Sequence, residues 1–282
     1  MHLSPGVELL ILGGAVVAGL VGALMGLGGG VLIIPMLTAL GVDIRHAIAA
    51  SIIAVIATSC GAASAYLRDG LANIRIGIFL SVATTTGALL GAALNGILPT
   101  RALFFVFSVV LAGSGVSMFR KRARGIAPIE AEPAAGGGGR ALRLGGRFYD
   151  PALGRVRRYV PRRPGLGFGL MLVAGAVSGL LGIGSGALKV PAMDVAMDLP
   201  IKVSTATSNF MIGITALASA LVYLLRGQVL VSLVSPIALG VVAGSALGTR
   251  LLPRLKASTI RGWFVVVLAA VVTQMLVHGV RG

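Results

Sequence analysis

Two glycine clusters, each followed by a short apolar run, are the features of this chain whose residue types and spacing could do chemistry. The first cluster is residues 26–30, followed by Pro35, and the second is residues 182–186, followed by Pro191. Glycine disfavours a helix interior by about 1 kcal/mol relative to alanine, so each cluster predicts a helix break. A helix that restarts after a break presents unpaired N–H groups and a positive dipole end, which favour an anion. The two clusters therefore predict two anion-binding helix starts.

Hydroxyl and amide side chains near these clusters are the natural companions of such a site. They can hydrogen-bond an oxyanion without carrying a fixed charge. The alternative is that they only join neighbouring helices by hydrogen bonds. With the glycines themselves, the predicted substrate-binding residues are Gly28, Gly29, Gly30, Ser51, Gly184, Ser185, Gly186, Thr207, Ser208 and Asn209.

Lys189 is the one cation within either short run, and Ile33 is its counterpart in the first half. An ammonium group at membrane depth is costly, so such a lysine suggests function by default. It could bind an anionic substrate. The alternatives are a structural ion pair with Asp194 or an extended side chain that reaches the membrane surface. We keep all three readings, and we include Lys189 among the predicted substrate-binding residues.

The elements that must position these residues are membrane helices. Of 282 residues, 56% are hydrophobic and only 11% are charged, and the mean hydropathy is +0.99. Soluble domains are about 25% charged. Several apolar runs reach the roughly 20 residues that cross a bilayer as a helix. The sequence predicts an all-α polytopic membrane protein, located in the inner or plasma membrane.

The chain repeats itself. The glycine cluster with Pro35 recurs 156 residues later, and the pairs Tyr66/Tyr223 and Gly87/Gly244 follow at an offset of 157. This ordered series predicts two homologous halves. The apolar runs are 7–25, 31–41, 46–66, 75–95 and 101–119, and then 166–181, 187–199, 202–225, 229–251 and 258–279. In each half the second run is too short to cross, so we expect a re-entrant hairpin followed by three transmembrane helices.

A strongly basic segment separates the halves. Of the 24 Lys and Arg residues, 12 lie in residues 120–163, against Glu130, Glu132 and Asp150. The predicted domains are residues 1–119, a first transmembrane repeat; 120–165, a basic, largely disordered cytoplasmic linker; and 166–282, a second repeat. Because basic loops stay in the cytoplasm, three crossings per half give the better charge distribution, which favours inverted repeats with both termini outside. The linker could also touch anionic lipids.

The glycine clusters, together with the polar stretches that end at Tyr66 and Tyr223, resemble the TauE/SafE family of sulfite exporters. The resemblance covers nearly the whole chain except the linker. It implies export of small sulfur-containing anions such as sulfite, sulfoacetate or similar organosulfonates. The linker is longer than we expect for such permeases.

We therefore expect a secondary transporter with a midplane site formed by the two breaks. The alternatives are an anion channel and a permease for another small carboxylate or inorganic anion. An enzyme is not expected, because the apolar runs supply almost no acid, base or nucleophile. No cofactor, metal or nucleic-acid partner is expected; the partners are a small anion, the lipid bilayer and, as an open alternative, a second copy of the chain.

Overall fold

A computed structural model of the whole chain describes residues 5–95, 97–123, 144–150, 154–182 and 186–281. Residues 1–4, 96, 124–143, 151–153, 183–185 and 282 lie outside the described part. The predicted site residues Gly184 and Ser185 lie outside the described part.

The first half forms five helices. They are α1 (Pro5–Met25), α2 (Gly30–Ala39), α3 (Ile44–Arg68), α4 (Ile74–Asn95) and α5 (Thr100–Ala123). The 10-residue α2 is about 15 Å long, half the hydrocarbon thickness of a bilayer. Between α2 and α3 the chain turns at Gly41, which has a φ of 80°, and the Asp43 carboxylate then caps α3 by accepting from Arg45 N at 2.9 Å.

The second half repeats this order. It comprises α7 (Pro164–Leu181), α8 (Gly186–Pro191), the π-helix η1 (Ala192–Ala196), α9 (Ile201–Leu225), α10 (Val231–Leu251), the short 3₁₀ helix η2 (Leu252–Arg254) and α11 (Ala257–Arg281). Short run 187–199 thus becomes one and a half turns of α-helix followed by a π-helical turn. The predicted all-α polytopic architecture is confirmed, with helix bounds close to those of the apolar runs.

The expectation of a largely disordered linker is wrong for its described second part. Strands β1 (Gly146–Asp150) and β2 (Arg155–Tyr159) form an antiparallel hairpin in which Gly146 pairs with Tyr159. Phe148 and Tyr159 are buried, so the hairpin has an apolar face that packs on the helices. The basic composition concealed this strand pattern. Residues 124–143 of the linker lie outside the described part.

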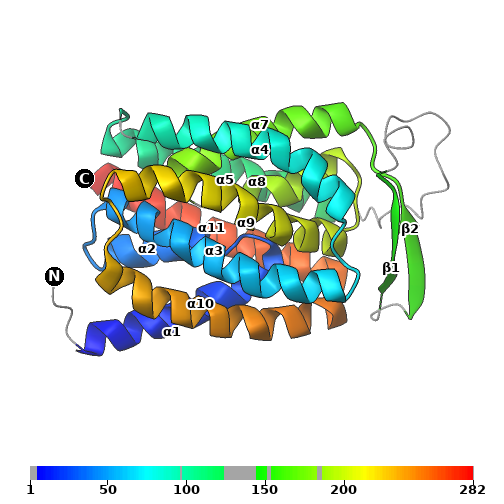
Figure 1. Cartoon of the computed structure of the whole chain (residues 1–282), viewed down its shortest axis with the longest axis horizontal. Coiled ribbons are helices and arrows are strands. Elements are labelled where there is room, and N and C mark those ends of the chain that lie inside the picture. Colours follow the sequence, from blue (N-terminus) through cyan, green and yellow to red (C-terminus); the bar gives the residue numbers. More distant parts are fainter. Residues whose placement is uncertain (1–4, 96, 124–143, 151–153, 183–185, 282) are drawn as a thin grey trace.

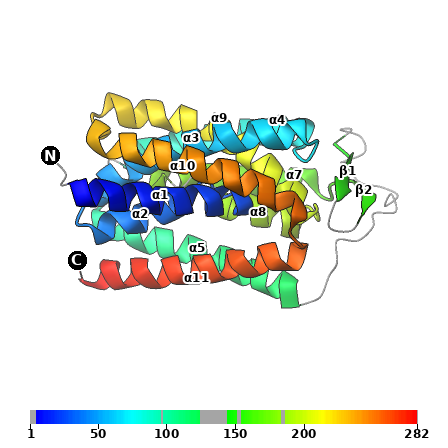
Figure 2. The same cartoon turned by 90° about the horizontal axis from the view of Figure 1, so that it is seen from below.

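The helices run side by side, and the linker hairpin lies across one end of the bundle (Figures 1 and 2). The start of α1 and the end of α11 lie at the opposite end. Helix α2 turns back beside α1 toward that end, whereas α7 starts at the linker end and α8 turns back toward it. The α1–α2 and α7–α8 hairpins therefore open toward opposite ends of the molecule.

The halves are interleaved rather than separate. α1 packs mainly against α10 and α7 mainly against α4, while α3 packs on α9 and α5 on α11. Each opening helix thus lies against the fourth helix of the other half.

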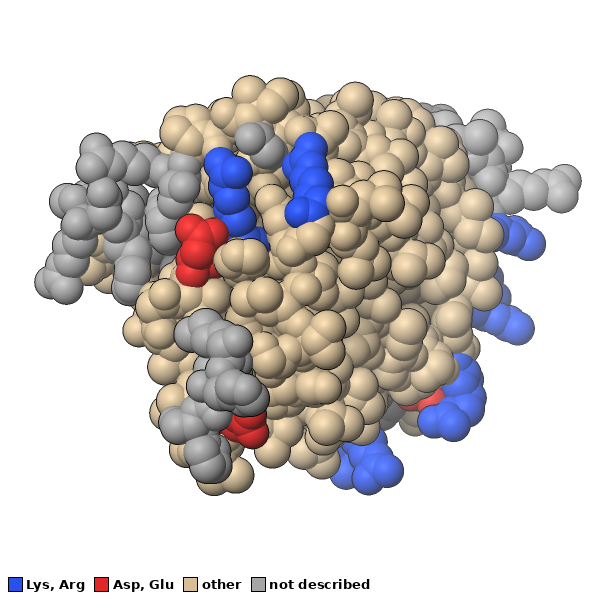
Figure 3. All heavy atoms as spheres, turned by 60° about the vertical axis from the view of Figure 1, so that its left-hand side comes forward, with Lys and Arg blue, Asp and Glu red and all other residues tan. Residues whose placement is uncertain are grey.

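Six helices in the described part are long and apolar enough to span a membrane: α1, α3, α4, α7, α9 and α10. Their outer faces expose large apolar side chains, among them Val17, Ile78, Val173, Leu217 and Leu239. Figure 3 shows one face of the molecule on which uncharged residues form most of the surface and the charged side chains are few. This distribution fits a bundle whose sides contact lipid and whose ends contact water.

Candidate functional site

The two predicted helix breaks form and lie against each other. In the first break Gly26, Gly28 and Gly29 have φ angles of 70°, 74° and 76°, and in the second Gly182 has 67°. These are left-handed conformations that favour glycine. A methyl group at Gly186 would overlap the carbonyl oxygen of Gly26, so no side chain fits between the breaks. The chain needs glycine both to end the helices and to bring the ends together.

Two serines tie the breaks together in a crossed pattern. Ser51 Oγ in α3 donates to Gly182 O at 2.7 Å, and Ser208 Oγ in α9 donates to Gly26 O at 2.9 Å. Ser51 and Ser208 are repeat equivalents, as are Gly26 and Gly182. Each half therefore satisfies, with the same residue, a carbonyl group exposed by the break in the other half. Both serines are completely buried.

Two tyrosines also donate to carbonyl groups near the breaks, one helical turn earlier in the chain. Each of these bonds stays within one half. Tyr66 OH donates to Ala23 O at 3.0 Å, and Tyr223 OH donates to Gly179 O at 2.7 Å. These carbonyls belong to the last turns of α1 and α7, which lack intrahelical partners. The tyrosines thus hold the two helix ends that lead into the breaks.

Thr207 and Asn209 flank Ser208 on α9 and are also buried. Asn209 Nδ2 donates to Ala23 O and to Thr205 O, both at 3.1 Å, while its Oδ1 has no partner among the described residues. Thr207 Oγ1 accepts from Asn73 N at 3.0 Å. In this conformation the Asn209 amide bonds the backbone near the first break and leaves its Oδ1 without a partner among the described residues, whereas Thr207 bonds the turn between α3 and α4.

Lys189 is fully buried, and its Nζ donates to Thr215 Oγ1 at 2.8 Å. Thr84 Oγ1 of α4 lies 3.2 Å from the same hydroxyl. No ion pair to Lys189 is found among the described residues. Neither alternative from the sequence holds, because Asp194 pairs with Arg261 through contacts of 2.8 and 3.1 Å, and the lysine does not reach the surface.

The glycines at the start of α2 occupy a mixed environment. Gly30 opens α2 and is buried, and no side chain caps the helix at Gly29. A methyl group on Gly29 would lie 3.3 Å from Thr58 Oγ1, and one on Gly28 would lie 3.1 Å from Val55. The start of α2 therefore faces one hydroxyl group and otherwise apolar side chains.

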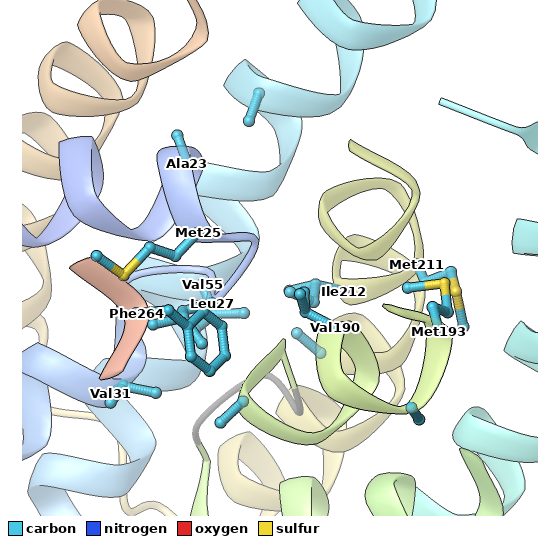
Figure 4. Close-up of a cluster of buried hydrophobic side chains, with 14 of the residues drawn as sticks. Ala23, Met25, Leu27, Val31, Val55, Val190, Met193, Met211, Ile212 and Phe264 are labelled. Atoms are coloured by element: carbon cyan, nitrogen blue, oxygen red, sulfur yellow. The ribbon is translucent and has the colours of Figure 1, made fainter. Parts of the chain in front are cut away.

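Apolar side chains enclose the region around the breaks. Figure 4 shows Leu27 close to Val55 and Phe264, and Val190 close to Ile212, which come from helices of both halves and the first break. All five are almost completely buried. Polar groups near the breaks are therefore surrounded by material of low polarity, in which electrostatic interactions are stronger than in water.

The described residues contain no group of three or more His, Cys, Asp or Glu side chains that could hold a metal ion. The chemistry available around the breaks is hydrogen bonding and the positive charge that Lys189 can carry. This inventory suits recognition of an anion.

The sequence profile of the family described as "Sulfite exporter TauE/SafE" matches residues 11–275. The chain belongs to the TauE/SafE family. A "Probable membrane transporter protein YunE" of Bacillus subtilis (strain 168) is 27% identical over 97% of this chain and 98% of its own length. Proteins called "Probable membrane transporter protein" from two strains of Xylella fastidiosa, Temecula1 and 9a5c, are each 29% identical over 85% of this chain and 84% of theirs. No solved structure matches the chain at a significant level.

As a TauE/SafE protein with six helices of spanning length in its described part, the chain is a multi-pass membrane transporter. Sequence reasoning missed two residues of the polar cluster, Thr215 and Thr84. Thr215 could have been found, because it lies in the polar stretch that ends at Tyr223 and has an equivalent threonine, Thr58, in the first half. Thr84 could not, because its equivalent is the apolar Val241 and nothing in the sequence connects it to Lys189.

Proposed function

We propose that this transporter is a secondary carrier that exports small sulfur-containing anions, such as sulfite, sulfoacetate or similar organosulfonates, through a midplane site between the two glycine breaks. The observation that carries the proposal is Lys189, which is fully buried beside the breaks and bonded to a neutral threonine. Among the described residues no carboxylate pairs with Lys189, and a buried cation without a counter-charge is expensive. A bound anion would supply the missing charge.

The family description supports the sulfur anion as the substrate class, since its printed name is that of a sulfite exporter. The hydroxyl groups near the breaks are chemically suited to an oxyanion. Ser51, Ser208 and Thr215 could each donate to an oxygen atom if they exchanged their present partners for the anion. Charge-assisted hydrogen bonds are about twice as strong as neutral ones, which would favour that exchange.

We also infer that the two halves are inverted repeats. The opposite openings of the α1–α2 and α7–α8 hairpins support this, as do the crossed bonds from Ser51 and Ser208. Inverted-repeat transporters commonly place broken helices at the membrane midplane and switch access by moving one repeat against the other. In such a cycle the crossed serine bonds would lie near the pivot.

Flux measurements in proteoliposomes test the proposal. The purified protein should take up radiolabelled sulfite or sulfoacetate faster when the same unlabelled anion is trapped inside, because a carrier exchanges substrate across the membrane. Steady electrical conductance without such counterflow would instead identify an anion channel. Uptake of a dicarboxylate in preference to every sulfur anion would replace the substrate class, and absence of flux with all of these anions would overturn the proposal.

A further inference from the structure

The β1–β2 hairpin has two distinct faces. Phe148, Asp150 and Tyr159 are buried against the bundle, whereas Tyr149 and Val156 are more than half exposed on the other face. The strand register places Tyr149 directly opposite Val156, so the exposed residues share one side of the ribbon. The hairpin therefore packs on the end of the bundle through one face, and its other face is exposed to solvent.

The strongest contact of the docked face is ionic. Asp150 Oδ1 lies 2.7 Å from Lys202 Nζ, and the two side chains are only 7% and 3% exposed. Lys202 lies in the first turn of α9, six residues before Ser208. The ion pair therefore connects the linker to the helix that contributes Ser208, Asn209 and Thr215 to the region of the breaks.

Asn73 makes a second connection. Its Nδ2 donates to Leu144 O at 3.1 Å and to Tyr159 OH at 3.0 Å, and its backbone N–H donates to Thr207 Oγ1 at 3.0 Å. Burial raises the pKa of the Tyr159 phenol above its ordinary value, against the effect of the Asn73 hydrogen bond, so the phenol stays neutral. The hairpin thus reaches the neighbour of Ser208 through one intervening residue.

The repeat shows what the hairpin adds. Lys202 is the equivalent of Arg45, and each cation also donates to a carbonyl in the turn after the fourth helix of its half. Lys202 Nζ donates to Pro253 O at 2.9 Å, and Arg45 donates to Leu98 O at 3.1 Å. Among the described residues no carboxylate pairs with the Arg45 guanidinium as Asp150 pairs with Lys202. Asp43 contacts only the backbone N–H of Arg45. Both halves therefore have the contact from the cation to the carbonyl group, and the linker adds an ion pair with Asp150 in the second half only.

We propose that the β1–β2 hairpin is a gate on the linker side, which stabilises the closed state of that side through Asp150 and Asn73 and leaves the bundle when that side opens. This inference rests on the proposed transport function. Its polar contacts are suited to the task because hydrogen bonds and an ion pair can be exchanged for water when the hairpin leaves, whereas the burial of Phe148 and Tyr159 favours the docked position. Without these contacts, the free energy of the state in which the linker side is closed would rise relative to the state in which that side is open.

A reversible cross-link tests the gate. In a Cys60→Ala background, Asp150→Cys and Lys202→Cys together remove both buried charges, so neither is left unpaired. A short bis-methanethiosulfonate reagent then joins the hairpin to α9. Bridging should lower anion flux in proteoliposomes at least tenfold, and reduction of the bridge should restore it. The reagent should leave the flux of a Val156→Cys control, whose cysteine lies on the exposed face, within twofold. Flux that is unchanged by bridging would overturn the proposal.

A distance measurement supplies a readout that does not depend on transport. Spin labels at Val156→Cys and Arg250→Cys, in the same background in lipid nanodiscs, should report a second, longer distance besides the docked one. Labels at Val231→Cys and Arg250→Cys, which lie at the two ends of the single helix α10, should report one distance only. If the protein moves no anion but the hairpin pair shows two distances, the substrate proposal fails and the gate stands. If the hairpin pair shows a single distance, the gate is overturned whatever the flux.

Discussion

Ser51 and Ser208 show how single residues hold this fold together. Each hydroxyl satisfies a carbonyl group that a glycine break has released from its helix, and each does so across the boundary between the halves. A carbonyl left without a partner inside a membrane protein is costly. The pair therefore explains how the chain can tolerate two broken helices beside each other.

Replacing either serine by alanine should destabilise the protein by a similar amount. We expect about 1 kcal/mol for Ser51→Ala and for Ser208→Ala, because each leaves a buried carbonyl unpaired. Ser204→Ala is the matched control, since Ser204 is buried on the same helix as Ser208 and its hydroxyl has no partner among the described residues. Reversible unfolding in mixed micelles measures all three. Equal effects of Ser204→Ala and Ser208→Ala would contradict the assignment.

At this scale the sequence could single out Lys189, but it could not predict the contacts that Lys189 makes. Lys189 stood out because a charge within an apolar run is rare. Its partner did not, because threonines are common in membrane helices and only the folded chain brings Thr215 and Thr84 together. Asp194 is close to Lys189 in sequence, which suggested an ion pair between them. In the structure Asp194, in the π-helix η1, pairs with Arg261 of α11 instead.

At the scale of the elements, glycine ridges set how closely helices approach. A methyl group on Gly87 would overlap Leu172 O of α7, and one on Gly244 would overlap Val16 O of α1. Leu172 and Val16 are themselves repeat equivalents. Gly87 and Gly244 thus let two pairs of helices pack closely, and the two repeats make the same contact.

Gly244→Val should therefore separate α10 from α1 and destabilise the protein by about 1–3 kcal/mol or more. Gly113→Val is the control, because a methyl group at Gly113 in α5 meets nothing within 4 Å. Thermal unfolding followed by fluorescence-detected size exclusion compares the two. A loss of stability for Gly113→Val as large as for Gly244→Val would mean that helix propensity, not contact, determines the effect.

The helices were predictable because membrane spans are long and uniformly apolar, which is the strongest local signal a sequence carries. The β1–β2 hairpin was not predictable, because its two strands are only five residues long and together contain four arginines and one aspartate. Its order depends on contacts with Asn73 and Lys202, which are distant in sequence. Tertiary contacts of this kind leave no local pattern.

At the scale of the whole molecule, charge and fold agree on orientation. Arg68, Arg75, Lys202 and Arg254 lie at helix ends on the side of the linker, whereas Arg45 and Arg226 lie at helix ends on the side of both termini. The linker itself adds a large positive charge. Because positive charge is retained in the cytoplasm, the linker side should be cytoplasmic.

Thiol labelling of intact cells tests this orientation. In a Cys60→Ala background, a membrane-impermeant maleimide should label Ile97→Cys, which is exposed in the turn after α4, and should not label Asp69→Cys at the other end of the bundle. Permeabilised cells should show both labels. Labelling of Asp69→Cys but not Ile97→Cys in intact cells would invert the topology, and the linker hairpin would then face outward.

The most direct test of the anion site is the melting temperature of the purified protein with sulfite, sulfoacetate, sulfate and dicarboxylates. A ligand that binds the folded state raises this temperature by mass action. We predict a rise with at least one sulfur anion. We also predict that Lys189→Met raises the dissociation constant about tenfold or more, since a hydrogen bond to a charged group contributes about 1.5–3 kcal/mol. Lys189→Met should not itself unfold the protein, because it removes a buried charge that has no ionic partner among the described residues. An undiminished rise in Lys189→Met would contradict the account, because the anion would then bind without the lysine at its centre.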